Sequence, residues 1–443
     1  MIRFLRKSST RPATAFGKIV PGQSGFELQG SVDLRTSTRI FGWVRDAAKP
    51  GARVQVVART ENEILSTGVA DIHRPDLELA GIGDGCHAFE LTFHKSDTDR
   101  VFIETVETAQ VVPVAPYAIE DATPVHHGED GWLFLRTGAN NVEKFYRVKN
   151  HLTDDEIEQW CLILKKRKQN LTAHGISYFH MIAPDKITVY ADKYGSKLPH
   201  YDSRPSLVLP SALTNIGFDD LYIDLSCPLM LKRDSRPLYW KTDTHWTYFG
   251  AAIAVQEICR ALNLLAPDFS NGVFREYTAT LDLGSVIEPP ISEAFKVFEF
   301  SNPAKLIFAN PLVAQSFAES PKYPAGLLHG CHVVYRNEYA PNSQKVALFG
   351  DSYCGVDQSL LTGLVAQTFR EVHFFWSNSI DYGYIAEIKP DIVLSELAER
   401  FVKRVPDDER DLRSFAVTQH AAFTAKRDAL QSKSESDEAK NLA

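Results

Sequence analysis

The segment KVALFGDSY, residues 345–353, predicts a class of fold and the position of a reactive group within it. Its first six residues form a short apolar run that ends at a glycine, which is typical of a buried strand. Gly350 permits a sharp turn of the backbone, and we expect a helix to follow Ser352. The segment therefore predicts a serine hydroxyl held at the end of a strand, close to the backbone N–H groups of a helix N-terminus.

Strand-like and helix-like segments alternate on both sides of this one. Thr153-Asp-Asp-Glu156 is a capping box that predicts a helix through about Ala173, and a second helix is expected after His245. This alternation predicts an α/β fold with a three-layer parallel sheet, in which reactive groups collect at the carboxyl ends of the strands. The other predicted strands are ISYFHMIAP at 176–184, DLYIDLS at 220–226, EVHFFW at 371–376 and PDIVLSEL at 390–397.

The N-terminal region has a different pattern, in which short alternating runs are separated by turn residues. Runs of this spacing predict a small all-β sandwich domain over residues 25–113. Residues 1–24 are expected to form a flexible leader, and residues 114–125 a linker, because prolines recur around that segment and it has no helical period. The predicted strands are RIFGWVRD at 39–46, RVQVVART at 53–60, HAFELTFH at 87–94 and RVFIETVET at 100–108.

The α/β domain is expected to span residues 126–405. Within it, residues 268–340 are rich in Pro, Gly and Asn, so we interpret them as a long insertion over the sheet edge or the active face, without assigning a topology. Residues 406–443 are charged and are expected to form a solvated C-terminal tail.

Composition and charge exclude several classes of protein. The chain has 443 residues, of which 44% are hydrophobic and 23% charged, as in folded globular proteins. Its 48 Lys and Arg against 56 Asp and Glu give a net charge of −8, which argues against a nucleic-acid partner. No apolar window approaches the roughly 20 residues that span a bilayer. Because residues 1–20 carry basic side chains and no apolar signal-peptide core, we expect a cytoplasmic protein.

Two motifs contain residues suited to nucleophilic catalysis. A serine hydroxyl such as that of Ser352 needs a base to remove its proton, and the base needs a carboxylate to orient it. In YWKTDTHW, residues 239–246, Asp243 and His245 are two positions apart, so in an extended segment they lie on one side and can hydrogen-bond. Each motif alone also fits a structural role, as a turn or as a polar loop with a histidine cap.

Metal binding is the competing chemical interpretation of Asp243, His245 and the pair His126-His127, because imidazole and carboxylate are zinc ligands. The sequence contains no His-Glu-x-x-His or comparably compact set, so we expect no metal. A phosphate-binding loop is excluded because the glycine-lysine signature is missing.

Taken together, Asp-Thr-His-Trp at 243–246 and Gly-Asp-Ser-Tyr at 350–353 resemble the alginate O-acetyltransferase branch of the SGNH hydrolase-like superfamily. The resemblance covers about residues 120–405. It implies that Ser352 is the nucleophile, His245 the general base and acid, and Asp243 the orienting carboxylate. Further matches are GEDGWLFL at 128–135, HMIAPDK at 180–186 and PDIVLSELAERFV at 390–402.

The resemblance also implies an activity and its partners. The expected reaction is O-acetylation of a polysaccharide or glycan through an acetyl-serine intermediate, with an acetyl donor and no tightly bound cofactor. Members of this family work in the periplasm and receive the acetyl group from a membrane partner, so a membrane-bound acetyl-transfer partner is implied. The alternatives are an acetyl-esterase with the same triad and a non-catalytic glycan-binding protein of the same fold.

Five further residues are candidates for binding or for stabilising the oxyanion. Lys186 and Tyr353 are candidate oxyanion donors, besides the backbone N–H of Ser352. Trp240 and Trp246 are a candidate platform for sugar rings, with burial in the core as the alternative. Arg400 either contacts substrate or forms an ion pair with Glu396, and we favour the ion pair. The N-terminal pieces FGWVRD, RPDL and GDGCHAFEL are similar to an immunoglobulin-like module found beside bacterial glycan-modifying domains. This similarity implies an accessory or carbohydrate-associated role, with a structural spacer as the alternative.

Overall fold

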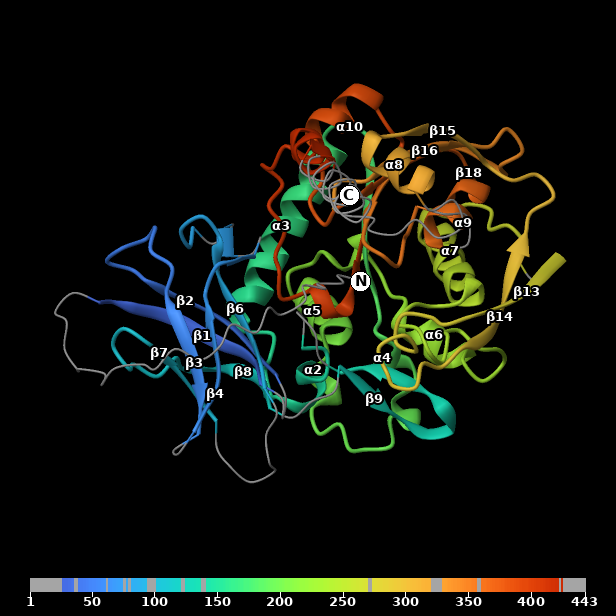
Figure 1. Cartoon of the computed structure of the whole chain (residues 1–443). Coiled ribbons are helices and arrows are strands. Elements are labelled where there is room, and N and C mark those ends of the chain that lie inside the picture. The colour runs from blue at the N-terminus through green and yellow to red at the C-terminus, as the bar shows by residue number, and fades with distance from the viewer. Residues whose placement is uncertain are drawn as a thin grey trace, which may run out of the picture. The chain divides into compact units, whose positions relative to one another are not determined.

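The computed structural model describes residues 26–35, 39–60, 63–74, 77–78, 81–93, 101–120, 124–136, 141–269, 273–319, 329–356, 360–421 and 424. These residues divide into two compact units, whose helices and strands are labelled in Figure 1. The N-terminal unit contains the described residues from 26 to 124 together with Arg136 and Asn141. The α/β unit contains residues 125–135 and the described residues from 142 onward. The predicted leader, residues 1–24, lies outside the described residues.

The N-terminal unit consists of two sheets that share one core. A five-stranded sheet has the order β5-β6-β2-β1-β8, and a three-stranded sheet has the order β4-β3-β7. Val44 and Phe89 from the first sheet and Val56 and Ile103 from the second belong to the same buried cluster, which confirms the small all-β sandwich. The strands are β1 Leu28–Arg35, β2 Arg39–Asp46, β3 Gln55–Arg59, β4 Ile64–Val69, β5 Ile72–His73, β6 Cys86–Thr92, β7 Phe102–Thr105 and β8 Val114–Glu120.

The segment expected to be a linker, residues 114–125, differs from that expectation. Its first part forms β8, which pairs in parallel with β1 at the end of the five-stranded sheet. Pro116 lies within β8, and a proline is tolerated there because an edge strand has one side without ladder hydrogen bonds. The three prolines around this segment therefore mark an edge strand rather than a break in structure.

The α/β unit is built on a seven-stranded sheet of order β12-β11-β19-β17-β18-β16-β15. The first five strands are parallel, as expected, whereas β16 pairs antiparallel with β18 and β15 antiparallel with β16. The expectation of a purely parallel sheet is thus corrected to a mixed sheet. The strands are β11 Ser177–Ala183, β12 Tyr222–Ile223, β15 Lys305–Ala309, β16 His332–Arg336, β17 Asn342–Gly350, β18 Phe369–Trp376 and β19 Ile392–Ala398.

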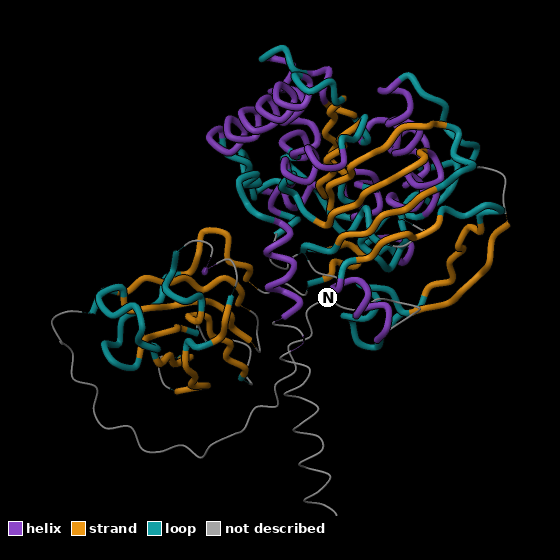
Figure 2. The backbone as a smooth tube through the Cα atoms, turned by 90° about the horizontal axis from the view of Figure 1, so that it is seen from above, coloured by secondary structure: helices purple, strands orange, loops and turns teal. Residues whose placement is uncertain are grey.

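Helices cover both faces of this sheet and give the three predicted layers. On one face, Trp160 of α3 stacks on His180 of β11, and Tyr384 of α10 contacts Phe375 of β18. Helices α7 and α9 pack together on the opposite side (Figure 1). Figure 2 distinguishes the helices and the strands of this unit by colour. The helices are α2 Lys144–Arg147, α3 Asp154–Thr172, α4 Lys186–Val189, α5 Pro205–Asn215, α6 Ser226–Lys232, α7 Tyr248–Leu262, α8 Pro311–Glu319, α9 Leu361–Thr368 and α10 Tyr382–Ile388.

The stretch interpreted as an insertion, residues 268–340, supplies two kinds of element. Its second half contributes β15 and β16 to the main sheet, so this part is not an insertion over the sheet. Its first half forms the antiparallel pair β13 Val273–Ala279 and β14 Glu293–Glu299, which we call the hairpin. The strands of the hairpin are mostly exposed or half-buried, so they form no part of the central core.

The predicted C-terminal tail is ordered in its first part. Residues 412–421 are helical, and the side chains of Leu412 and Ala416 are buried in the core of the α/β unit. Asp408 forms a buried ion pair with Arg167 of α3, with 2.7 Å between Oδ1 and Nη2. Residues 425–443 lie outside the described residues. None of the helices that the structure describes is both long and apolar enough to span a membrane.

Candidate active site

The serine of the Gly-Asp-Ser-Tyr motif lies in a turn directly after β17. The N–H groups of Cys354 and Gly355 donate to the carbonyl of Asp351, at 3.1 and 3.2 Å, and the next described helix, α9, begins only at Leu361. The helix expected after Ser352 is therefore present but begins later than predicted, so Ser352 does not lie at a helix N-terminus. The Asp351 carboxylate explains the turn, because Oδ1 accepts from the Tyr353 N–H at 3.0 Å and Oδ2 from the Ala398 N–H at 2.7 Å.

The buried carboxyl group of Glu396 supports this turn through two hydrogen bonds. Oε2 of Glu396 accepts from the Asp351 N–H at 3.1 Å and from Cys354 Sγ at 3.2 Å, and burial raises the pKa of Glu396 well above its usual value. A Cβ on Gly350 would clash with Cys354 Sγ and lie 2.8 Å from Glu396 Oε2. A side chain at position 350 would therefore displace Cys354 or Glu396, which support the turn, and the half-buried Ser352 follows at the carboxyl end of β17.

The second motif, residues 239–246, forms a loop that is held from inside by a lysine. The Lys186 ammonium donates to three backbone carbonyls of the loop, those of Trp240 at 3.0 Å, Lys241 at 2.9 Å and Asp243 at 2.6 Å. Burial lowers the pKa of Lys186 to about 7. Because all three donors of the ammonium group are engaged, Lys186 holds the loop in this structure and has no donor left for an oxyanion.

Replacing Lys186 with methionine is expected to destabilise the α/β unit. The change leaves three carbonyls of the loop without their donor, and the loss is about 2–4 kcal/mol in the free energy of unfolding. Urea unfolding followed by tryptophan fluorescence measures it, because five of the six tryptophans lie in this unit. The exposed Lys197→Met is the matched control, and equal unfolding midpoints for the two variants would contradict the role of Lys186.

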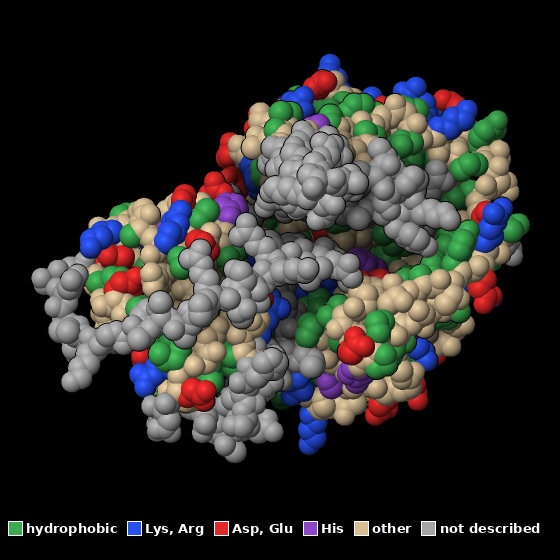
Figure 3. Space-filling model, in the orientation of Figure 1, with side chains coloured by type: hydrophobic (Ala, Val, Ile, Leu, Met, Phe, Trp, Pro, Cys, Tyr) green, Lys and Arg blue, Asp and Glu red, His purple; other side chains and the backbone are tan. Residues whose placement is uncertain are grey.

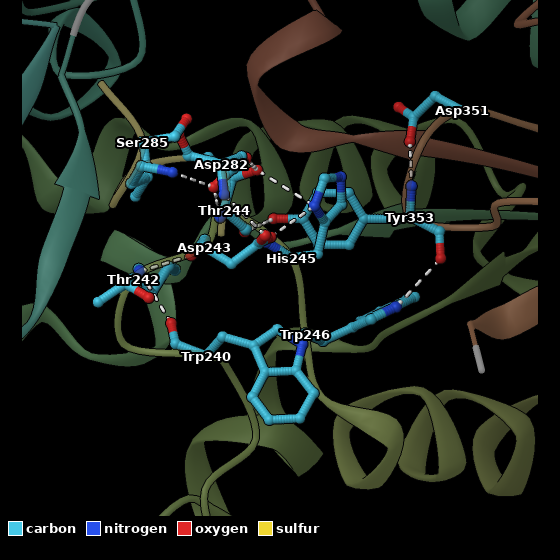
Figure 4. A network of polar contacts seen from close by, with 12 residues as sticks. Trp240, Thr242, Asp243, Thr244, His245, Trp246, Asp282, Ser285, Asp351 and Tyr353 are labelled. Carbon is cyan, nitrogen blue, oxygen red and sulfur yellow. Dashed lines mark hydrogen bonds and ion pairs between the residues drawn. The ribbon is translucent and has the colours of Figure 1, made fainter. Parts of the chain in front are cut away.

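Asp243 and His245 form the pair that the sequence predicts. Asp243 Oδ1 accepts from His245 Nδ1 at 2.7 Å and from the His245 N–H at 2.8 Å (Figure 4). Burial disfavours charge on the imidazole, but the Asp243 carboxylate outweighs it and raises the pKa of His245 above its usual value. His245 Nε2 is buried and has no hydrogen-bond partner among the described residues. The ring is thus oriented by a carboxylate at one nitrogen and unoccupied at the other.

The turn that carries Ser352 (residues 351–355, the serine turn) and the loop that carries His245 (residues 239–246, the histidine loop) are joined through Tyr353. Its hydroxyl donates to the Thr244 carbonyl at 2.8 Å, its own carbonyl accepts from Trp246 Nε1 at 3.1 Å, and its ring centroid lies 5.1 Å from that of His245. Ser352 is the neighbour of Tyr353 in the chain, so its backbone lies beside the histidine loop. Ser352 and His245 share no hydrogen bond in the part of the chain that the structure describes.

The structure also places the aromatic candidates and Arg400, and some of their contacts differ from those expected. Tyr353 and Trp246 are fully buried and bonded to each other, so Trp246 cannot serve as a sugar platform. Trp240 is half-buried, with its ring 5.2 Å from that of Phe295.

The expected ion pair of Arg400 with Glu396 is wrong, because Arg400 Nη1 lies 2.6 Å from Asp185 Oδ1. It also donates to the Tyr353 hydroxyl at 3.3 Å.

One residue of the site, Asp282, was missed by the sequence analysis. Its carboxylate accepts from the Thr244 N–H at 2.8 Å and the Thr244 hydroxyl at 2.5 Å, and its N–H donates to Asp243 Oδ2 at 3.3 Å. Asp282 thus braces Asp243 and Thr244 (Figure 4). No motif marks it, since it lies 37 residues after His245 in a stretch without clear periodicity.

Asp243, His245 and Asp282 form the one group of metal-ligating side chains detected in the described residues, with their ligand atoms within 4.8 Å of one another. Each oxygen of both carboxylates already accepts an N–H or O–H donor of the protein. His245 Nδ1 is engaged with Asp243, which leaves Nε2 as the one unengaged ligand atom. The arrangement therefore matches a hydrogen-bonded catalytic pair better than a metal centre. His126, the other metal candidate, hydrogen-bonds to the Tyr194 carbonyl at 2.6 Å.

Replacing Asp282 with asparagine is expected to move the acid limb of the pH–rate profile to lower pH. The negative charge of Asp282 is one of the influences that raise the pKa of His245, and a base works only in its neutral form. Removing that charge lowers the pKa of His245, so the base becomes neutral at lower pH. Hydrolysis of an acetyl ester between pH 4 and 9 measures the shift, and an unchanged acid limb would contradict it.

Comparison with known proteins gives the site a context. Residues 125–281 match the SGNH hydrolase-like domain of the acetyltransferase AlgX. The match includes the Asp243–His245 pair and ends before Ser352. It confirms the resemblance to the alginate O-acetyltransferase branch and the SGNH-like fold of the α/β unit.

Two curated relatives of this chain are named probable alginate O-acetylase AlgJ. The protein of Pseudomonas fluorescens is 27% identical over 137 residues, which are 30% of this chain and 32% of that protein. The protein of Pseudomonas syringae pv. tomato is 29% identical over 143 residues, which are 32% of this chain and 34% of that protein. The chain thus spans about a third of the length of the curated relatives that it matches.

Solved structures that match this chain include the O-acetyltransferase domain of Pseudomonas putida AlgJ and Bacillus cereus PatB1. The AlgJ domain is 17% identical, with a TM-score of 0.43, and the comparison covers 67% of this chain and 99% of that one. PatB1 is 14% identical, with a TM-score of 0.45, and the comparison covers 63% of this chain and 97% of that one.

The expectation of a cytoplasmic protein is wrong. AlgJ and AlgX, which this chain resembles, are periplasmic alginate-modifying proteins. The expectation rested on the absence of an apolar leader from the sequence, and such an absence carries no information about where a folded protein works.

Proposed function

We propose that the chain is a serine-dependent O-acetyltransferase that moves an acetyl group onto a hydroxyl of a polysaccharide. The observation that carries this proposal is the state of His245, with Nδ1 bonded to Asp243 and Nε2 buried without a partner next to the Ser352–Tyr353 turn. A base oriented in this way is what a serine hydroxyl requires to become a nucleophile. Ser352 is then the nucleophile, His245 the general base and acid, and Asp243 the carboxylate that orients and stabilises the imidazolium.

The reaction takes place in two displacements. In the first, Ser352 Oγ attacks the carbonyl carbon of an acetyl ester while His245 Nε2 takes the hydroxyl proton. The donor's alcohol then leaves with that proton, and an acetyl-serine ester remains. In the second, His245 takes a proton from a sugar hydroxyl, which attacks the acetyl-serine, and the proton returns to Ser352 Oγ as the sugar ester departs.

The oxyanion of each tetrahedral intermediate needs N–H donors that are not already engaged. The Tyr353 N–H is bound to Asp351 and the Cys354 N–H to the Asp351 carbonyl, so neither is available. The Ser352 N–H has no acceptor among the described residues, and we assign it as a donor to the oxyanion.

The proposed acceptor is a polysaccharide such as alginate, because the relatives are named alginate O-acetylases. The acetyl donor is a diffusing or partner-bound ester, and no tightly bound cofactor takes part. A membrane-bound acetyl-transfer partner that supplies the group is part of the same proposal, and so is action in the periplasm.

Intact-protein mass spectrometry tests the proposal. The full chain is incubated with 4-nitrophenyl acetate, with and without oligomannuronates, and the modified peptide is mapped. We expect one acetyl group on Ser352, which is lost when the oligosaccharide is added and recovered on the sugar. Loss of the acetyl group to water alone, in the presence of the sugar, would assign an esterase. Absence of both adduct and ester turnover would contradict serine catalysis and favour a glycan-binding protein.

A further inference from the structure

The hairpin formed by β13 and β14 is attached directly to the loop that carries Asp243 and His245. Glu293, the first residue of β14, accepts from the Lys241 N–H at 3.0 Å, the Thr242 N–H at 2.8 Å and the Thr242 hydroxyl at 2.8 Å. The Thr242 carbonyl in turn accepts from the N–H groups of Leu283 and Gly284. The end of the hairpin at which β13 connects to β14 is therefore hydrogen-bonded to the histidine loop.

Three aromatic rings form a row that begins at this junction. The Trp240 ring lies 5.2 Å from that of Phe295 at an interplanar angle of 74°, and the Phe295 ring lies 5.8 Å from that of Tyr277 at 28°. Tyr277 and Phe295 are directly opposite each other in the hairpin, so they share one face. We call Trp240, Phe295 and Tyr277 the aromatic ledge.

The aromatic ledge is not explained by packing of the core. At the other end of the hairpin, Phe274 and Phe298 contact Tyr248 of α7 and belong to the core cluster. None of the three ledge residues is part of a core cluster in the described chain. Tyr277 is 43% exposed, and Trp240 and Phe295 are half-buried. In Figure 3, hydrophobic side chains are visible over the surface that β14 forms.

A ligand for such a row needs flat apolar faces and polar edges. A sugar ring fits this description, because its C–H face stacks on an aromatic ring while its hydroxyls stay hydrated at the rim. The distances between neighbouring ring centroids in the ledge are comparable with the length of one sugar unit. Arg275 lies on the same face of the hairpin as Tyr277, and its Nε is 2.6 Å from Oε1 of Glu299. A guanidinium group therefore also lies beside the aromatic ledge.

We propose that the aromatic ledge binds sugar units of the polysaccharide acceptor and leads the chain to the Asp243–His245 pair. The proposal rests on the proposed acetyltransferase function and adds the place where the acceptor is held. Because the row runs away from the histidine loop, its outer member, Tyr277, meets only units that are distant from the reacting hydroxyl. The ledge therefore gives long acceptors an advantage over short ones.

Acetyl transfer to oligomannuronates of two to eight units tests this in the full chain. For the wild-type protein we expect KM to fall with acceptor length. In Tyr277→Ala the KM for the eight-unit acceptor is expected to rise tenfold or more, with a smaller change for the two-unit acceptor, so the dependence on length is largely lost. Tyr339→Ala, an equally bulky change at a side chain that is 76% exposed elsewhere on the unit, is the matched control.

A binding measurement separates this proposal from the proposed function. Ser352→Ala and Ser352→Ala/Tyr277→Ala are titrated with the eight-unit oligomannuronate, and binding is followed by calorimetry. Tighter binding by the single variant supports the ledge even if the wild type transfers no acetyl group. Equal affinities of the two variants, no binding by either, or an equal loss of length dependence in Tyr339→Ala would overturn it. Phe295→Leu keeps an apolar contact without a ring, and we expect its KM to lie between those of the wild type and Tyr277→Ala.

Discussion

Ser352→Ala is expected to lower turnover of an acetyl ester by on the order of 10³-fold and to abolish the acetyl adduct on the protein. Alanine removes the hydroxyl that attacks the donor and leaves the turn intact, because the hydrogen bonds of the turn use Asp351, Tyr353 and Cys354. Release of 4-nitrophenol measures turnover, and intact mass measures the adduct.

The matched control for this change is Ser235→Ala, whose hydroxyl donates to the Lys232 carbonyl on the exposed surface. It is expected to keep both the turnover and the adduct of the wild type. If Ser352→Ala retained the acetyl adduct, the nucleophile would have to be another residue, and the proposed mechanism would fail.

Asp243→Asn is expected to reduce turnover by roughly 10³-fold and to shift its pH dependence. The Asp243 carboxylate holds the proton of His245 on Nδ1 and raises the pKa of His245. An amide cannot stabilise the imidazolium, so the pKa of His245 falls. Because the base is active when neutral, the acid limb of the residual activity moves to lower pH while the plateau drops.

The pH–rate profile of Asp243→Asn is compared with that of Asp234→Asn, a control at a carboxylate that is 92% exposed. An acid limb at the wild-type position, or a variant with wild-type plateau activity, would show that Asp243 does not act through His245. Circular dichroism of each variant confirms that the fold is retained.

Much of the fold follows from local sequence. Thr153 caps α3 with the reciprocal hydrogen bonds of a capping box, and the predicted strand at 176–184 appears as β11 over Ser177–Ala183. Both depend on neighbouring residues, namely side-chain chemistry at the helix start and an apolar run bounded by turn signals. The Asp243–His245 contact was predictable for the same reason, because its partners are two residues apart.

Other features depend on packing between distant segments. Arg400 pairs with Asp185, 215 residues away, because β11 and β19 are neighbours in the sheet, whereas Glu396 lies close to it in sequence but faces the serine turn. Asp282 reaches Thr244 only after the chain has returned to the histidine loop. The antiparallel pairing of β15 and β16 could likewise not be predicted, because the periodicity of an apolar strand does not depend on the direction of its neighbours.

The attachment of the hairpin at Glu293 has a consequence for how this scaffold can diversify. The Glu293 carboxylate and the N–H groups of Leu283 and Gly284 join residues 241–242 to the hairpin, whereas the serine turn is supported separately by Glu396 and Asp351. In the described chain, the side chains of residues 294–297 make no hydrogen bond to Asp243, His245 or the serine turn, so they can change without altering the hydrogen bonds of the reacting groups. The surface of the hairpin can therefore vary among proteins of this fold while the geometry of the reacting groups stays the same.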